Sequence, residues 1–216
     1  MTDLDGPRWG PKAGKPAQLV VLCHGLGADG HDLIDLAPHW SGAVPHAAFA
    51  APDAPEQCDQ SPTGRQWFSV ADRTPARMLA GVTIAATDLN AFIDAELARL
   101  GLPPTAYALM GFSQGAMTAL FTGLRRPHPP RGILAFSGAL MGAGDLPVRD
   151  DPPPVLLVHG EEDGVVPVER SRLAEAALRT HGVDVQALYC PRLGHGIDEA
   201  GLSTGALFLQ RIFAPA

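Results

Sequence analysis

Six short apolar runs recur along the chain, and each is hydrophobic at both odd and even positions. A strand covered on both faces has this pattern, whereas a strand with one solvent-facing side alternates between apolar and polar residues. The sequence therefore predicts six buried strands: Leu19–Cys23, Ala47–Ala51, Tyr107–Met110, Ile133–Phe136, Val155–Val158 and Val185–Tyr189.

Helical periodicity lies between these runs, and it is clearest after Thr74. Thr74 and Pro75 are typical of an N-cap and a first helical residue. Arg99 would then fall in the last turn, and Gly101 is a stop signal. Apolar residues recur every three or four positions in between: Val82, Ala86, Leu89, Ile93, Leu97 and Leu100. The pattern predicts one long helix with a single buried face.

Three further helices are expected. The first covers Ala116–Leu124, the second starts at Pro167 and ends before Gly182, and the third covers residues 203–213. In the second helix, the residues expected to face inward are Leu173, Ala177 and Leu178.

This order of strands and helices predicts an α/β fold, with a mostly parallel sheet and helices on both faces. We expect a single domain over residues 1–216, with residues 1–17 irregular or forming a weak edge hairpin. Residues 52–75 form a long, helix-poor connection, and such connections often carry function. No pattern in the sequence shows how this connection covers the rest of the molecule.

Composition narrows the class of protein. The 216 residues are 46% hydrophobic and 18% charged, with a net charge of −7. No stripe of lysine and arginine is present, so nucleic acid is not expected as a partner. No apolar run approaches the roughly 20 residues of a membrane span, and the first twenty residues lack a signal-peptide core, so stable membrane insertion is not expected. Three widely separated cysteines form no disulfide or metal framework, which favours the cytoplasm.

A candidate nucleophile lies in Gly111-Phe112-Ser113-Gln114-Gly115, a G-x-S-x-G pentapeptide. An apolar strand leads into it and a helix-forming stretch leads out, which is the setting that this motif requires on an α/β-hydrolase sheet. The two glycines would remove Cβ atoms where strand and helix crowd together, so that Ser113 sits on a tight, strained turn. The alternative is a glycine-rich turn in which Ser113 only caps the helix.

A serine hydroxyl needs a base to take its proton, and on this fold the acid and then the histidine follow the serine in the chain. Of the histidines after Ser113, we favour His195, which follows the last strand between Gly194 and Gly196, two glycines that would let its side chain approach the serine; the others are His128, His159 and His181. The acid is expected on the loop after Val155–Val158, which holds Glu161, Glu162 and Asp163. Asp163 is preferred because Gly164 follows it, although at least one of these acids belongs to a solvated surface loop.

The loop from His24 to Gly30 follows the first strong strand and is rich in glycine. We expect its Leu26 N–H and the Gln114 N–H to form an oxyanion hole. A phosphate-binding loop is the rival, but the G-x-G-x-x-G spacing is absent and no lysine follows the glycines. His24 is expected to be structural. The aromatic pair Trp67 and Phe68 either belongs to the core or lines a shallow acyl pocket.

With these motifs together, the chain resembles the carboxylesterase/phospholipase family of α/β-hydrolases, which includes bacterial carboxylesterases and acyl-protein thioesterases. The matching segments are residues 24–30, 51–55, 65–68, 111–116, 160–167 and 194–196. The resemblance implies a compact enzyme with no large cap domain, no metal and no cofactor, and it allows for a homodimer. It implies Ser113, Asp163 and His195 as catalytic residues, Leu26 and Gln114 as oxyanion donors, and substrate contact near Trp67 and Phe68.

The implied reaction is hydrolysis of short- to medium-chain carboxylic esters, small molecules, through an acyl-enzyme intermediate. The natural substrate, its acyl length and its alcohol stay open. A lysophospholipase or thioesterase of the same fold is the first alternative. A non-catalytic ligand-binding relative is the alternative from another class, and the presence of Ser113, Asp163 and His195 argues against it. A dienelactone-type hydrolase fits less well, because that activity calls for cysteine where this chain has Ser113.

Overall fold

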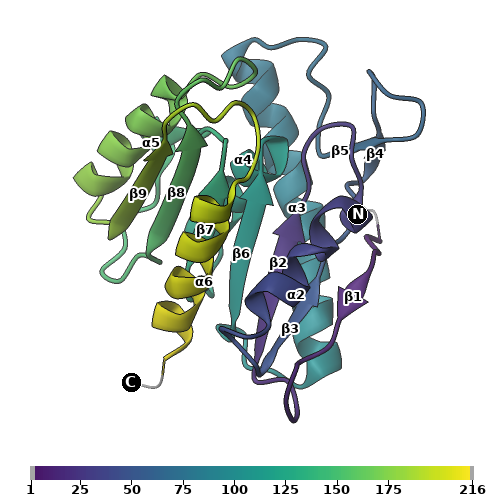
Figure 1. Cartoon of the computed structure of the whole chain (residues 1–216). Coiled ribbons are helices and arrows are strands. Elements are labelled where there is room, and N and C mark those ends of the chain that lie inside the picture. Colours follow the sequence, from purple (N-terminus) through teal and green to yellow (C-terminus); the bar gives the residue numbers. More distant parts are fainter. Residues whose placement is uncertain (1–2, 215–216) are drawn as a thin grey trace.

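The computed structural model describes residues 3–214 and contains one seven-stranded sheet in the order β1-β3-β2-β6-β7-β8-β9 (Figure 1). All six predicted strands are present, and neighbouring strands among them pair in parallel. They are β2 (Gln18–Cys23), β3 (Ala47–Ala50), β6 (Tyr107–Phe112), β7 (Ile133–Phe136), β8 (Val155–Gly160) and β9 (Val185–Cys190). The carboxyl ends of these strands therefore lie along one rim of the sheet.

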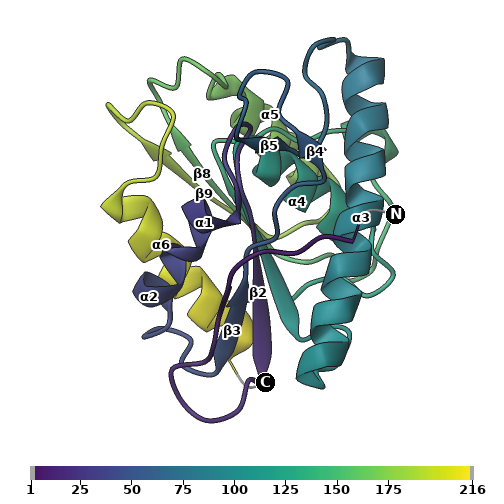
Figure 2. The same cartoon turned by 90° about the vertical axis from the view of Figure 1, so that its right-hand side faces the viewer.

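Helices cover both faces of the sheet, as Figure 2 shows edge-on. One face carries α3 (Pro75–Leu100), α4 (Gln114–Arg125) and α5 (Glu169–Thr180), and the other carries α1 (Gly30–Ile34), α2 (Leu36–Trp40) and α6 (Glu199–Phe213). Successive strand residues alternate between the two cores: Leu19 and Val21 pack on the first face, and Val20 and Leu22 on the second. This explains why the strands are apolar at both parities.

The long helix α3 begins and ends where the sequence predicts. Gly101 takes the left-handed conformation (φ 66°), and its N–H donates to the carbonyls of Leu97 and Ala98. Thr74 precedes the helix in extended conformation, although its side chain makes no capping hydrogen bond. Within the described residues, α3 has the length and mean hydropathy (1.2) to cross a membrane. Its apolar face packs in the core against the sheet and α4, as a core helix does.

The last two helices differ in detail from the prediction. α5 begins at Glu169 rather than Pro167, and Leu173 is 65% exposed, so its predicted inward position is wrong. The buried residues of α5 are Ser171, Ala174 and Leu178. α6 begins at Glu199 and contains the predicted residues 203–213; the acidic residues Asp198 and Glu199 are typical of a helix start, and the side chain of Asp198 accepts a hydrogen bond from Gly201 N at 2.8 Å and caps the helix.

Two segments hold short strands outside the six predicted ones; in residues 1–17 an edge hairpin is the alternative to irregular structure, but the strand found there pairs with β3 instead of forming a hairpin. In the N-terminal segment, β1 (Arg8–Trp9) pairs antiparallel with β3 as an edge strand, and the other described residues up to 17 are irregular; residues 1–2 lie outside the described residues. In the 52–75 connection, β4 (Glu56–Gln57) pairs with β5 (Arg65–Gln66). A 3₁₀ turn, Ala143–Asp145, follows β7. All helices in residues 3–214 belong to these layers or turns, so no separate cap domain occurs there.

Candidate active site

Ser113 lies at the sharp turn between β6 and α4, on the carboxyl rim of the sheet. Its backbone is strained, with φ 54° and ψ −117°, and its N–H donates to Phe136 O on the neighbouring strand at 2.9 Å. A non-glycine residue at positive φ persists only where its surroundings enforce it. The turn therefore places the Ser113 side chain above the sheet and at the N-terminus of α4.

The two motif glycines make this turn possible by close approach. A Cβ atom on Gly111 would lie 2.3 Å from Gly115 O, and one on Gly115 would lie 2.0 Å from Cys23 O. No side chain fits at either position without moving the backbone. The prediction that both glycines relieve crowding between strand and helix is confirmed.

His195 reaches Ser113 from the loop between β9 and α6. Its Nε2 lies 3.0 Å from Ser113 Oγ, and its ring centroid lies 4.8 Å from that of Phe112. The flanking glycines were expected to permit this approach, but a Cβ on Gly196 would meet open space and one on Gly194 only an atom 4.0 Å away. The essential glycine is instead Gly160, where a Cβ would lie 2.2 Å from Leu193 O.

Asp163 is buried behind His195 on the loop after β8. Its Oδ2 lies 2.7 Å from His195 Nδ1, and its Oδ1 accepts hydrogen bonds from the N–H groups of Val165 and Val166 at 2.8 Å each. Burial opposes ionisation, but the hydrogen bonds from His195, Val166 and Val165 outweigh it and lower the pKa of Asp163. A carboxylate at Oδ2 makes Nδ1 the donor, which leaves Nε2 free to accept the Ser113 proton.

The other acids of this loop face solvent, as expected. Glu161 and Glu162 are exposed, and Glu161 pairs with Arg172 at 2.9 Å. The three predicted residues Ser113, Asp163 and His195 thus form one continuous chain of hydrogen bonds, although they come from three distant loops.

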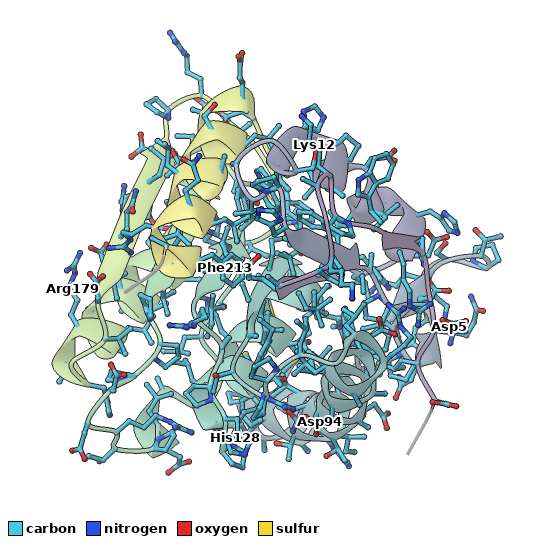
Figure 3. The ribbon with its side chains drawn as sticks, turned by 90° about the horizontal axis from the view of Figure 1, so that it is seen from below. Asp5, Lys12, Asp94, His128, Arg179 and Phe213 are labelled. Carbon is cyan, nitrogen blue, oxygen red and sulfur yellow. The ribbon has the colours of Figure 1, made fainter. Side chains whose placement is uncertain are left out.

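The remaining candidate histidines occupy other places. His181 Nδ1 lies 2.9 Å from Ala177 O at the end of α5. His128 lies at the amino end of the sheet, where Tyr107 OH donates to its carbonyl at 2.9 Å; Figure 3 labels it in the view from below. His159 is fully buried and its Nε2 lies 3.2 Å from Asp163 Oδ2, a contact that the sequence did not reveal.

His24 is structural, as predicted. It is fully buried, its Nδ1 lies 2.7 Å from Gly25 O, and its Nε2 accepts from Ala54 N at 2.9 Å. Burial lowers the pKa of His24, which keeps the ring in the neutral form that this acceptor role requires.

The two predicted oxyanion donors flank Ser113. A Cβ on Gly25 would lie 3.5 Å from Ser113 Cβ, so the Leu26 loop runs beside the serine. Gln114 is the first residue of α4, where backbone N–H groups have no partner inside the helix. Within residues 3–214, the N–H groups of Leu26 and Gln114 have no hydrogen-bond acceptor. Their role as oxyanion donors stays a prediction.

The 52–75 connection packs on both of these donor segments. The Gln114 side chain accepts from Trp67 N at 2.9 Å and donates to Phe68 O at 2.7 Å. Arg65 exchanges backbone hydrogen bonds with the Leu26 loop, receiving one from Gly27 N and donating one to Ala28 O. No sequence pattern indicates this function of the Gln114 side chain, because glutamine after the nucleophile predicts only a backbone donor.

Trp67 and Phe68 are core residues, 1% and 2% exposed. The indole N–H of Trp67 donates to His24 O at 2.9 Å. The structure therefore favours the core alternative over a pocket wall for both side chains, and direct contact of either residue with substrate stays a prediction.

Metal ligands and thiols are the other groups that could carry chemistry in this fold. Within residues 3–214, no group of three or more His, Cys, Asp and Glu residues is arranged to bind a metal ion. The cysteines Cys23, Cys58 and Cys190 are free and buried, and burial raises the pKa of Cys190 to about 11. A depression of about 570 Å³ lies beside Arg131 and Pro154, which precede β7 and β8, so it is at the amino end of the sheet, away from Ser113.

Known proteins resemble this chain over most of its length. The chain matches the family described as Phospholipase/Carboxylesterase over residues 7–212. The crystal structure of esterase PE8 is 40% identical, with a TM-score of 0.91, and the match covers 98% of this chain and 100% of that chain. Esterase YpfH of Escherichia coli is 29% identical, over 87% of this chain and 80% of that protein. Acyl-protein thioesterase 1 of Gibberella zeae is 27% identical, over 95% of this chain and 94% of that protein.

Proposed function

We propose that this chain, which belongs to the phospholipase/carboxylesterase family of α/β-hydrolases and is a carboxylic ester hydrolase, acts through an acyl-enzyme on Ser113. Its proposed substrates are short- to medium-chain carboxylic esters. The observation that carries the proposal is the chain of hydrogen bonds from Ser113 Oγ to His195 (3.0 Å) and from His195 to Asp163 (2.7 Å). Its order and geometry are those that activate a serine hydroxyl.

Acylation begins when His195 Nε2 takes the Ser113 proton as Oγ attacks the ester carbonyl. The imidazolium that forms is stabilised by Asp163, which remains ionised because its own pKa is lowered. His195 then returns the proton to the departing alcohol, which leaves the acyl group on Ser113. Water deprotonated by His195 attacks this acyl-enzyme in the same way and releases the carboxylic acid.

The tetrahedral oxyanion of each step rests on the N–H groups of Leu26 and Gln114. The N-terminus of α4 adds partial positive charge beside the same oxygen. Each such donor contributes about 3–4 kcal/mol to the transition state, since it is already oriented before charge develops.

The test combines a substitution with a covalent probe. Ser113→Ala should lower kcat for a short p-nitrophenyl ester by about 10³-fold or more. A fluorophosphonate probe should label the wild type and not the variant. Ser41→Ala is the matched control, because Ser41 is also buried but lies at the end of α2, where its hydroxyl donates to Pro38 O. Wild-type ester turnover in Ser113→Ala, or a folded wild type that resists the probe, contradicts the proposal.

A thioester substrate is the second candidate, and a relative named as an acyl-protein thioesterase supports it. The same three residues suit it, because a thiolate leaves more readily than an alkoxide and needs less help from His195. A series of acyl esters and matched acyl thioesters of increasing chain length decides between them. Higher kcat/KM for esters at every length supports the ester hydrolase, and the reverse order supports the thioesterase.

A further inference from the structure

His159 is a second histidine in contact with the carboxylate of Asp163. It lies near the carboxyl end of β8 and is fully buried. Its Nε2 is 3.2 Å from Asp163 Oδ2, the oxygen that also binds His195, and 2.8 Å from Val166 O. Both side chains of this pair are 0% exposed, so no solvent screens their interaction.

The neighbours of His159 determine where its protons lie. Both groups facing Nε2 are hydrogen-bond acceptors, so Nε2 carries a hydrogen. On the other side of the ring, Nδ1 lies 2.7 Å from Ser171 Oγ on α5, and Ser171 Oγ is also 3.4 Å from Gly138 O. The Ser171 hydroxyl either donates to a neutral ring or accepts from a charged one while donating to Gly138 O. The ring is anchored in both states.

We infer that His159 is a positioning residue of the catalytic site: its Nε2–H, which donates to Val166 O, lies beside Asp163 Oδ2 and thereby sets the orientation and the effective negative charge that Asp163 presents to His195. This inference rests on the proposed function. The hydrogen bonds of Ser113, His195 and Asp163 are thus continued by the 3.2 Å contact of Asp163 with His159 and by the bond of His159 to Ser171, which links the nucleophile to the first turn of α5.

The expected effect has a definite sign. Asp163 Oδ2 faces the N–H groups of two histidine rings, that of His195 at 2.7 Å and that of His159 at 3.2 Å. If the N–H dipole of His159 is removed, more of the negative charge acts on His195 and favours its imidazolium form, so a higher pH is needed to generate the base. Loss of this dipole also makes Asp163 easier to protonate. Both changes move the acid limb of the pH–rate profile to higher pH.

Other charged groups around this chain are paired elsewhere. They are Glu161 with Arg172, Glu175 with Tyr189 OH, and Cys190 with Asp198; Glu162 is exposed. Among the described residues, none of them forms a hydrogen bond or ion pair with His159 or Asp163. A shift in the acid limb is therefore traceable to His159.

The competing explanation is that His159 only closes the loop onto β8 through Val166 O. A purely structural histidine would change stability when replaced, but it would leave the protonation of His195 unchanged. The experiment therefore needs a readout of His195 that does not depend on folding stability or on turnover.

The main comparison is between His159→Leu and His159→Gln, because the glutamine amide retains an N–H near the position of Nε2. Tyr107→Phe is the matched control: it deletes another buried hydrogen bond, at the opposite end of the sheet. His159→Leu should lower kcat about 10- to 100-fold through misplacement of His195. It should also move the acid limb of the pH–rate profile to higher pH by about half a pH unit or more. His159→Gln should lie closer to the wild type in both respects, and Tyr107→Phe should match the wild-type profile.

Protonation of His195 is followed directly by ¹⁵N NMR titration in a Ser113→Ala background, so the result does not require an active enzyme. The inference is overturned if His195 titrates at the same pH with and without His159, or if the Leu and Gln variants have the same pH profile. If His159→Leu does not fold, Ser171→Ala replaces it and should shift the acid limb in the same direction; an unchanged profile again overturns the inference. Failure of the proposed function is recognised separately, as a wild type that the fluorophosphonate does not label.

Discussion

Gln114 and Trp67 are joined by a 2.9 Å hydrogen bond that runs from the Trp67 backbone N–H to the Gln114 side-chain oxygen. The amide nitrogen of the same side chain donates to Phe68 O, so one glutamine binds the backbones of two consecutive residues of the 52–75 connection. Arg65, two residues before Trp67, is bonded to the Leu26 loop. The segment from Arg65 to Phe68 therefore links the two backbone donors proposed for the oxyanion.

We expect Gln114→Ala to weaken both catalysis and stability while keeping its own backbone N–H. Two buried backbone groups lose their partners, which costs about 1–3 kcal/mol each at most. kcat should fall about tenfold or more, since a small displacement of an oxyanion donor weakens transition-state stabilisation. Steady-state kinetics and urea unfolding measure the two effects. Gln57→Ala is the control, because this exposed glutamine also binds two carbonyls of the connection, those of Ser61 and Gly64. Equal kcat losses in the two variants would count against the link.

The ionised state of Asp163 should make its contribution to stability depend on pH. Burial opposes its charge, but hydrogen bonds from His195, Val166 and Val165 prevail and lower the pKa of Asp163. A carboxyl whose pKa is lowered by folding contributes stability above its unfolded pKa, about 3.9, and this contribution is lost as pH falls through the folded pKa. The difference in free energy of unfolding between wild type and Asp163→Asn should therefore be largest near pH 7 and shrink below about pH 4.

Urea unfolding at a series of pH values measures this difference. Glu161→Gln is the control, because its exposed ion pair with Arg172 should contribute about 0–1 kcal/mol at any pH. A difference that stays constant from pH 7 to pH 3 would mean that Asp163 has no lowered pKa.

The layered fold was predictable from the sequence because each strand is buried on both faces. Runs such as Val155–Val158 are therefore apolar at both odd and even positions. The three residues of the hydrogen-bonded chain were predictable because the nucleophile motif and the chain order constrain where an acid and a base can lie. Strands of two residues, such as Arg8–Trp9, are too short to carry periodicity. The inward position of Leu173 was wrong because the buried face of α5 includes Ser171, a polar residue bound to His159 that does not appear in a hydrophobic pattern.

Tertiary contacts of polar groups were the part that the sequence could not reveal. His159 ends a strand, and nothing in the neighbouring sequence indicates that it faces Asp163. Likewise, the need for Gly160 arises from the carbonyls of Leu193 and Gly194, which are more than thirty residues away in the chain. Such contacts depend on the final packing and leave no local pattern.

The glycines of the site should differ sharply in their tolerance of a side chain. Gly115→Ala places a methyl group 2.0 Å from Cys23 O, so the backbone must shift and the free energy of unfolding should fall by about 1–3 kcal/mol or more, with loss of activity. Gly196→Ala meets open space and should keep both stability and kcat near wild type, although Gly196 is adjacent to His195 in the chain. Thermal unfolding and ester turnover test both variants. A severe defect in Gly196→Ala would restore the expectation that this glycine enables the approach of His195.

Trp67 and Trp40 form a matched pair that separates stability from catalysis. Both indoles are buried, and each donates one hydrogen bond to a backbone carbonyl: Trp67 to His24 O at 2.9 Å, and Trp40 to Leu202 O at 3.0 Å on the opposite face of the sheet. Replacement of either by phenylalanine deletes the indole hydrogen bond and leaves a small void, so both variants should lose about 1–3 kcal/mol of stability.

Only Trp67→Phe should also lower kcat. The hydrogen bond that it loses holds His24 O, which lies at the start of the loop that carries Leu26, the proposed oxyanion donor. As a core residue, Trp67 should affect esters of every acyl length by a similar factor. The measurement is kcat/KM for both variants across a chain-length series. A loss in Trp67→Phe that grows or reverses with acyl length would mean that the indole lines the acyl pocket, and it would restore the substrate contact expected from the sequence.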